Sequence, residues 1–359
     1  MKIANTPTAP PYYGAIKHKT LIHALQYNAV ATPDKVFLRW VNSKCEVVDS
    51  LTYQQLLSRA TTVATLLLTR GVKRGDRVMI SYPFGLEVVA GIYGCMLLSV
   101  IPCSVYPPNP SKSAAAFSFR QFNNQVKDAG AKFALTTTKF RLVLRTVALT
   151  TSHRTNVTWL ATDMLKSSAK EAILSEYIPS PRESALIQYS SGSTGEPKGI
   201  VLSHSAIIHN LECIWSDHSC KTQANSSGCT WMPQYHDFAL IGFMIGPCYS
   251  DKDPCVMCSP VDFIQNPLLW ADMIETFEST RTAGPNFAYA LLAKRMEAAG
   301  RVLTNSTLLC TSIAAEPIAP QTLAKMAAIG FPEESMVPAY GKSFHPDYLW
   351  WASFAKCHQ

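Results

Sequence analysis

The stretch RVMISYPFGLEVVAGIYGCMLLSVIPCSVYPP, residues 77–108, predicts the fold class of this chain. It opens with a short apolar run that is typical of a buried strand, and it ends with a second such run. The segment between them has the length and composition of a buried helix. A strand, a helix and a strand in this order form a β-α-β unit, which implies parallel strands in a sheet covered on both faces.

The absence of any charged side chain from residues 88–111 raises the alternative of a membrane span. Glycines and prolines interrupt the segment, at Gly91, Gly94, Pro102, Pro107, Pro108 and Pro110. A buried helix followed by a buried strand therefore fits better than a transmembrane helix. The start of the chain also lacks the apolar segment of a secretory signal, so we expect a cytoplasmic protein without a transmembrane segment.

Helical and strand patterns alternate on both sides of this unit. Residues 52–71 form a predicted helix that begins at Thr52, carries Gln55 at the position of a capping box and ends at Gly71. Further strands are expected at 131–138, 156–162, 185–189, 199–203, 281–284 and 306–313, and further helices at 205–215, 266–280, 286–296 and 319–330. This alternation specifies an α/β protein, interpreted as one unit with one or two sheets.

The composition favours a compact globular protein, because 47% of the 359 residues are apolar and 16% are charged. The formal net charge is +7, but the basic residues are scattered, and dense groups such as Lys139–Arg145 are short. They indicate a solvated surface, and no nucleic-acid partner is expected. The eleven cysteines have irregular spacing, which is typical of reduced, buried thiols. Cys255 and Cys258 form a lone C-x-x-C, so we expect buried strand residues and no zinc site.

A second informative stretch, YSSGSTGEPKG at Tyr189–Gly199, lies between predicted strands. A phosphate-binding loop needs inward-facing backbone N–H groups, hydroxyl donors and a cation. This loop supplies three glycines, four hydroxyls and Lys198. Its spacing differs from that of a Walker A loop, and the chain contains neither G-x-G-x-x-G nor G-x-S-x-G. From the residues alone two interpretations stand, a phosphate-binding loop and a surface turn rich in Ser, Gly and Thr.

Further motifs follow the loop in order. They are TWMPQYHDFALIGFMIGPCYS at 230–250, AGPNFAYALLAKRM at 283–296, TSIAAEPIAPQTLAKM at 311–326 and VPAYG at 337–341. Together with the loop they resemble the motifs of AMP-forming adenylating enzymes, the superfamily of acyl-CoA synthetases, luciferases and peptide-synthetase adenylation domains. The Tyr-His-Asp, GPNFAY and AEP forms, with YPP at 106–108, are most similar to fatty acyl-AMP ligases. The resemblance runs from about residue 21 to residue 341.

This resemblance implies the N-terminal domain of an ANL-type adenylating enzyme, a layered α/β/α fold with parallel-rich sheets that is incomplete at its C-terminal end. The domain would cover residues 1–341, with a divergent tail at 342–359. In this family a carboxylate attacks the α-phosphate of ATP, which releases pyrophosphate and leaves an acyl-adenylate. The implied function is ATP-dependent activation of a fatty acid or other carboxylate to acyl-AMP. The family also implies Mg²⁺ as a cofactor, and CoA or an acyl carrier protein as acceptor.

The resemblance also implies which residues bind the nucleotide. Its β- and γ-phosphates would contact Ser190, Ser191, Gly192, Ser193, Thr194, Gly195 and Lys198. Thr194 would lie nearest the metal. Its adenine would be enclosed by Ala314, Ala315, Glu316, Tyr340 and Gly341, with the Tyr340 ring stacked on the base.

For the acid substrate, the resemblance implies a second set of residues. His236 would lie beside the incoming carboxylate, and Asp237 would either orient His236 or cap the following helix. Asn286, Phe287 and Phe243 would line the acyl-binding site. The catalytic residues are expected to be His236, Lys198 and Thr194.

After Gly341 the resemblance ends. Phe344 stands where the family has a metal-binding Glu, and the sequence stops at Gln359 before the family's C-terminal domain and its catalytic lysine. His345 and Asp347 are interpreted as part of a solvated tail. We therefore expect a truncated or mis-spliced product with an exposed sheet edge, hence marginal solubility or a stabilising partner. Two alternatives to an active ligase stay open, a nucleotide- or acyl-binding module without turnover and an inert fragment.

Overall fold

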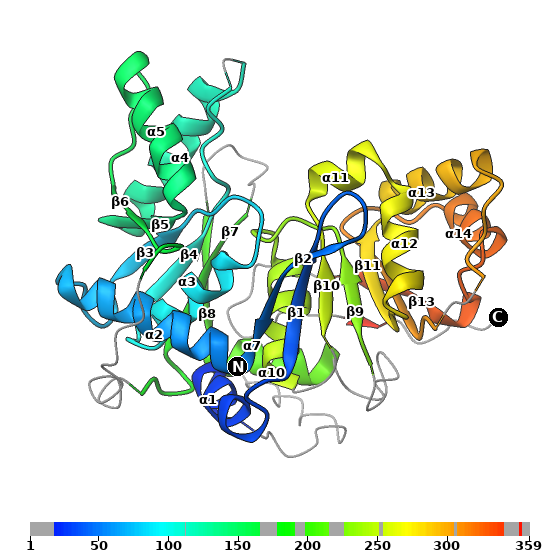
Figure 1. Ribbon diagram of the computed structural model, residues 1–359, viewed down its shortest axis with the longest axis horizontal. Helices are drawn as coiled ribbons and strands as arrows, with labels where there is room; N and C mark the ends of the chain where they lie inside the picture. The colour runs from blue at the N-terminus through cyan, green and yellow to red at the C-terminus, as the bar shows by residue number, and fades with distance from the viewer. Residues whose placement is uncertain are drawn as a thin grey trace, which may run out of the picture.

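The computed structural model of the chain describes residues 18–111, 113–165, 178–190, 198–214, 226–250, 254–304, 307–340 and 352–353. Figure 1 shows its strands in two separate sheets, with helices between and around them. The first sheet has the order β6-β5-β3-β4-β7-β8 and the second has the order β14-β13-β12-β11-β9-β10-β1-β2.

The strands of the six-stranded sheet are β3 (Arg77–Ile80), β4 (Ile101–Ser104), β5 (Phe133–Thr136), β6 (Thr158–Ala161), β7 (Ser184–Ser190) and β8 (Lys198–Ser203). Those of the eight-stranded sheet are β1 (Val36–Val41), β2 (Val47–Thr52), β9 (Gly228–Thr230), β10 (Cys255–Met257), β11 (Arg281–Pro285), β12 (Cys310–Ala314), β13 (Met336–Tyr340) and β14 (Ala352–Ser353). Neighbouring strands are parallel except in the pairs β1–β2, β7–β8 and β13–β14. The parallel-rich α/β class expected from the sequence is confirmed.

The β-α-β unit predicted from residues 77–108 is present. Strands β3 and β4 pair in parallel, with Val78 opposite Pro102, and α3 (Glu87–Met96) connects them. Every residue of α3 after Glu87 is buried, which explains its uninterrupted apolar sequence. Gly94 allows α3 to approach α2 (Tyr53–Thr69), because a Cβ atom at this position would lie 2.6 Å from Cβ of Val63.

The capping box predicted for the helix at residues 52–71 is also present. The backbone N–H of Gln55 donates to Oγ1 of Thr52 at 3.2 Å, and the N–H of Thr52 donates to Oε1 of Gln55 at 3.1 Å. The helix α2 ends at Thr69, and Gly71 follows it with a φ of +73°. A left-handed glycine after the last turn is a common helix stop.

The remaining helices lie between the two sheets and around them (Figure 1). Between the two sheets lie α7 (His204–Ile214), the π-helical η2 (Leu240–Ile245) and α10 (Gly246–Ser250), which contact β7, β8, β9 and β1. The far face of the eight-stranded sheet carries α11 (Pro260–Gln265), α12 (Leu268–Thr276), α13 (Asn286–Ala298) and α14 (Pro320–Ala328) (Figure 1). The other helical elements are α1 (Leu21–Ala31), α4 (Ala115–Ala129), α5 (Thr138–Thr150), α9 (Asp237–Ala239) and the 3₁₀ turn η3 (Glu333–Ser335). The layered α/β/α arrangement expected from the sequence is confirmed.

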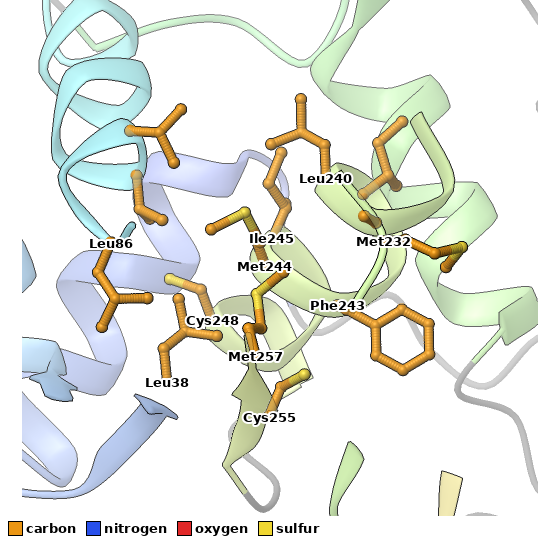
Figure 2. Close-up of a cluster of buried hydrophobic side chains, with 14 of the residues drawn as sticks. Leu38, Leu86, Met232, Leu240, Phe243, Met244, Ile245, Cys248, Cys255 and Met257 are labelled. Carbon is orange, nitrogen blue, oxygen red and sulfur yellow. The ribbon is translucent and has the colours of Figure 1, made fainter. Parts of the chain in front are cut away.

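The core between the sheets is built on η2. Figure 2 shows its side chains Leu240, Met244 and Ile245 among Leu38 and Leu86, with Phe243 on the side away from Leu86. All five aliphatic and thioether side chains are at most 1% exposed. Such burial is worth about 1.5–3 kcal/mol per side chain, so this helix holds the two sheets together.

Several elements were not predicted from the sequence. Among them are the helices α1, α4, α5 and α11, the β1–β2 hairpin, the three-residue strands β9 and β10, the strand β13 and the π-helical turn η2. The expectation for the thiols is confirmed for the eight cysteines whose side chains are described, because none of them forms a disulfide and only Cys45 is not buried. Within the described ranges, no group of three His, Cys, Asp or Glu side chains could hold a metal ion, and no helix could cross a membrane.

Candidate adenylation site

Strands of both sheets end at one region, where most of the predicted site residues lie. Three strands of the eight-stranded sheet end at Thr230, Pro285 and Ala314, and in the other sheet β7 ends at Ser190. In parallel sheets, ligands bind outside the carboxyl ends of the strands, because loops from neighbouring strands meet there. The fold therefore provides a binding edge made of loops from both sheets.

The residues predicted to enclose adenine and to line the acyl site are joined by hydrogen bonds across this edge. Pro285 and Ala314 are paired in the parallel ladder of β11 and β12, so the residues after them are neighbours. The backbone N–H of Phe287 donates to Oε1 of Glu316. The side-chain oxygen of Asn286 accepts from the N–H of Ala319 at 3.0 Å. These two bonds hold the loop after β12 against the start of α13.

Ala315 has an unusual backbone conformation, with a φ of +71°. This left-handed region is uncommon for a residue with a Cβ atom, and it costs about 1–3 kcal/mol when the surroundings impose it. Ala315 lies directly after β12 and is exposed at the strand end. Strained residues of this kind cluster at ligand sites, which agrees with the place that Ala315 has in the predicted nucleotide site.

His236 and Asp237 form a compact pair at the start of α9. Nδ1 of His236 lies 2.8 Å from Oδ1 of Asp237, and the backbone N–H of Phe238 donates to the same oxygen at 2.8 Å. Asp237 thus contacts the His236 ring and accepts from the N–H of Phe238, whereas the N-cap of α9 is His236, whose Nδ1 accepts from the same N–H at 3.3 Å. The hydrogen bond to Asp237 raises the pKa of His236 above its ordinary value, although partial burial of the ring opposes this.

Two buried glutamines hold the segment before His236. Nε2 of Gln188, on β7, donates to the carbonyl oxygen of Tyr235 at 2.6 Å. Gln234 accepts from the N–H of Gly85 at 3.0 Å and donates to the carbonyl oxygens of Tyr82 and Pro83, at 3.1 and 2.9 Å. These bonds join the loop after β9 to the ends of β7 and β3. The sequence analysis did not single out either residue, and the only signal was a glutamine inside or beside an apolar strand.

Aromatic rings surround the same segment. The rings of Tyr106 and Tyr235 meet edge to face at 4.9 Å between centroids, and Trp231 stacks on Phe263 at 4.0 Å. The ring of Phe287 is 6.3 Å from Trp231 and its residue is 48% exposed. Phe287 is thus an accessible aromatic residue at the carboxyl edge of the sheet.

Phe243 lies elsewhere. It lines an enclosed apolar cavity of about 20 Å³ between η2 and the strands β9–β12. The lining includes the first residues of these strands, Gly228, Cys255, Arg281 and Cys310. Gly228 packs closely here, because an added Cβ atom would lie 3.3 Å from the Phe243 ring. Phe287 does not line this cavity, so the two phenylalanines occupy opposite ends of the short strand β9.

The strands on either side of the predicted phosphate loop form an antiparallel hairpin. Ser190 pairs with Lys198, and Tyr189 pairs with Gly199. The loop residues Ser191, Gly192, Ser193, Thr194 and Gly195 lie outside the described residues, as does Gly341, and no side-chain position is described for Ser190 or Tyr340. Lys198 is exposed at the start of β8. Gly199 makes room for the Tyr189 ring, which would lie 3.1 Å from an added Cβ atom, and its φ is not positive.

The described geometry thus places the His236–Asp237 pair, the strained strand end at Ala315 and the two strands flanking the Ser-Gly-Thr loop at the carboxyl edges of the sheets. The sequence matches the model of the AMP-binding enzyme family over residues 25–343. The chain belongs to this family. It spans about half the length of the curated AMP-binding relatives that it matches.

One such relative is a medium-chain-fatty-acid–[acyl-carrier-protein] ligase of Moorena producens, 30% identical over 328 residues, which are 90% of this chain and 54% of that protein. Another is a probable long-chain-fatty-acid–AMP ligase of Mycobacterium tuberculosis, 28% identical over 92% of this chain and 58% of that protein. Among solved structures, a fatty acyl-adenylate ligase of L. pneumophila in complex with acyl adenylate and pyrophosphate matches with a TM-score of 0.77. It is 26% identical, over 91% of this chain and 56% of that one. These AMP-binding enzymes are what this chain is similar to.

Proposed function

We propose that this chain is the part of a fatty acyl-AMP ligase that binds ATP and a fatty acid and forms the acyl-adenylate. The observation that carries the proposal is the hydrogen bond from Gln188 to Tyr235, because it joins the strand of the Ser-Gly-Thr loop to the Tyr-His-Asp segment. The strand that leads into the proposed phosphate loop is thereby adjacent to the segment proposed to bind the carboxylate. Adjacent binding of the two reactants is the main requirement of an in-line displacement at phosphorus.

In the proposed reaction, a carboxylate oxygen of the fatty acid attacks the α-phosphorus of ATP. A P–O bond forms to the acid, the P–O bond to the β-phosphate breaks, and pyrophosphate leaves. His236 would receive the carboxylate, since its raised pKa favours the cationic form that attracts an anion. Asp237 would hold the orientation of the His236 ring through the contact of 2.8 Å.

The nucleotide would lie along the edge made by β7, β12 and β13. Lys198 would neutralise charge on the phosphates, and the hydroxyls of the loop from Ser190 to Thr194 would donate to them. Ala314, Ala315 and Glu316 would border the adenine, with Tyr340 and Gly341 across from them. Oxygen ligands suit Mg²⁺, and Thr194 remains the proposed contact of the protein with the ion.

The acyl chain would enter the apolar region near Phe287, with Asn286 at its mouth. The cavity at Phe243 has the lining of an apolar site, but its volume of about 20 Å³ accommodates about one water molecule. An acyl chain that extended into this cavity would therefore require the Phe243 ring to move. Two relatives are medium-chain-fatty-acid–[acyl-carrier-protein] ligases, which supports an acyl carrier protein as acceptor of the acyl group, with CoA as the second candidate. We further propose a cytoplasmic location, and the region 1–341 as one AMP-binding domain.

The decisive test is acyl-AMP formation by the purified chain with ATP, Mg²⁺ and fatty acids of several lengths. Acyl-AMP would be detected by mass spectrometry and pyrophosphate by a coupled assay. We expect product from the wild type, none from Lys198→Ala, and unchanged product from Lys44→Ala, which removes an exposed lysine of the β1–β2 turn.

Two other outcomes would replace the proposal. If no product forms but ATP binds with a saturable affinity that Lys198→Ala weakens, the chain is a nucleotide-binding module without turnover. If neither product nor binding is found, the chain is inert by itself, and the proposal that it forms acyl-AMP is wrong.

A further inference from the structure

Helix α5 has an unusual surface. It packs on its neighbours through one narrow face, made of Leu144 with Phe140 and Val147, and Leu144 is its only buried residue. On the opposite face, Leu142 is 55% exposed and Leu149 is 78% exposed. The two leucines are seven residues apart, which is two helical turns, so they point to the same side. Two large apolar side chains thus face away from the protein on one helix.

Basic residues accompany these leucines. Lys139, Arg141 and Arg145 are exposed on α5, and Arg145 lies between the two leucines on the helix surface. None of the three forms an ion pair with another described residue. From residue 130 to residue 162 the sequence has five Lys and Arg residues and no Asp or Glu. The helix is therefore a cationic amphipathic helix whose apolar stripe is directed outward.

Asp163 and Asp128 lie on either side of this stretch of sequence, and neither forms a described ion pair with a basic residue of α5. Asp163 is committed to the start of α5, where its Oδ1 accepts from the N–H and the hydroxyl of Thr138 at 2.7 and 2.8 Å. Asp128 accepts from the hydroxyl of Tyr189 at 2.7 Å. Figure 1 shows α5 with α4 at one end of the molecule, beside the β6 edge of the six-stranded sheet. At this position, a large flat partner could reach the helix.

We propose that α5 is a docking surface for a membrane that contains anionic lipids. Lysine and arginine beside such a surface contribute about 1 kcal/mol each, and the leucines can enter the headgroup–acyl boundary. The basic group Lys139–Arg145, expected from the sequence to be a solvated surface, is accompanied in the fold by the exposed Leu142 and Leu149. A nucleic acid would pair with the three cations but would leave Leu142 and Leu149 in water, so the apolar stripe favours a lipid surface.

The structure also sets the orientation of binding. The helix has thirteen residues and is therefore about 20 Å long, too short to span a bilayer. With both leucines on its outer face and Leu144 held in the protein, it would lie parallel to the membrane plane. This proposal is independent of adenylation, although a fatty acid dissolved in the same bilayer would then be close to the enzyme.

The test is co-sedimentation of the whole purified chain with two kinds of vesicle. One contains phosphatidylcholine only, and the other contains phosphatidylcholine with about 30% phosphatidylserine. We expect binding to the anionic vesicles at low salt, weak binding to neutral vesicles, and release by high salt. Arg141→Gln with Arg145→Gln should weaken the partition coefficient about 30-fold, because two lost charges remove about 2 kcal/mol. Leu142→Glu with Leu149→Glu should weaken it at least about tenfold.

The matched control is Val261→Glu with Ile264→Glu, which changes two exposed apolar residues of α11, 51% and 54% exposed. It should bind as the wild type does. The salt titration of the wild type keeps the test valid if a variant fails to fold. The proposal is overturned if the wild type does not bind anionic vesicles, if it binds neutral ones equally, or if the α11 control loses binding to the same extent. Preferential binding of a DNA duplex over vesicles would also overturn it.

Discussion

Nε2 of Gln188 donates a hydrogen bond of 2.6 Å to the carbonyl oxygen of Tyr235, across 47 residues of sequence. Gln188 belongs to the six-stranded sheet and Tyr235 to the loop after β9 of the eight-stranded sheet. The bond is partly buried, and Gln188 itself is 5% exposed. It therefore fixes the distance between the strand of the proposed phosphate loop and the segment that carries His236.

Replacing Gln188 by Met keeps the length of the side chain and removes the donor. The carbonyl oxygen of Tyr235 would lose its partner, which costs about 1–3 kcal/mol in a buried setting. We expect urea denaturation to show this loss in the free energy of unfolding, together with reduced acyl-AMP formation. Gln54→Met, at an exposed position of α2, should change the free energy of unfolding by less than about 0.5 kcal/mol. Equal effects of the two substitutions would mean that the bond does not hold the loop.

The left-handed backbone of Ala315 limits which side chains this position tolerates. A β-branched residue is far less tolerated at a φ of +71° than alanine is, so Ala315→Val should destabilise the chain by about 1–3 kcal/mol. Ala319→Val, in the same loop at a φ of −84°, should cost less than about 0.5 kcal/mol. Thermal unfolding followed by circular dichroism measures both. If Ala315→Val and Ala315→Gly were equally stable, the backbone would not be left-handed in solution.

The contact between His236 and Asp237 predicts a pH dependence. Because the folded-state pKa of His236 is raised, its contribution to stability is fully present below the unfolded pKa of about 6.5 and is lost as the pH rises through the folded pKa. The magnitude should be below about 1 kcal/mol, since the His236 side chain is half exposed. NMR titration should place the His236 pKa above 6.5 in the wild type and lower in Asp237→Asn. Asp34→Asn, at an exposed position without a described ion pair, should leave the titration unchanged.

The close approach of α2 and α3 makes a fourth prediction. Alanine in place of a helical glycine normally stabilises by about 0.5–1 kcal/mol, but at Gly94 the new Cβ atom would lie 2.6 Å from Cβ of Val63. We expect Gly94→Ala to destabilise by about 1–3 kcal/mol. Adding Val63→Ala should recover part of this loss, which a double-mutant cycle in urea would measure as a favourable coupling. Strict additivity would contradict the contact.

The parts of the fold that the sequence predicted have local causes. The apolar run of α3 and the capping box of Thr52 and Gln55 depend on residues a few positions apart, and both were found as expected. The strands β9 and β10 were missed because three residues are too few to show a period. The β1–β2 hairpin was missed because its turn has no Asn-Gly or Asp-Gly signal.

The candidate site likewise contains residues that were predicted from the sequence and residues that were not. Family motifs identified His236, Asp237 and Glu316, whose chemistry is visible in the residue type. The supporting contacts of Gln188 and Gln234 depend on pairings across 47 and 149 residues, which no local pattern indicates. Phe243 and Phe287 look alike in sequence, but the fold places them at opposite ends of β9, which only the strand order shows.

Because β7 and β8 form a hairpin, the loop between them can be replaced independently of the rest of the chain. The Ser-Gly-Thr loop starts and finishes on one rung of a ladder, formed by Ser190 and Lys198. The two strands that flank this loop pair directly with each other, at Ser190–Lys198 and at Tyr189–Gly199. Exchanging it for a two-residue turn would remove the loop residues proposed to bind phosphates and keep the paired strands on either side. Comparing this variant with the wild type would separate the contribution of the loop to folding stability from its contribution to the proposed nucleotide binding.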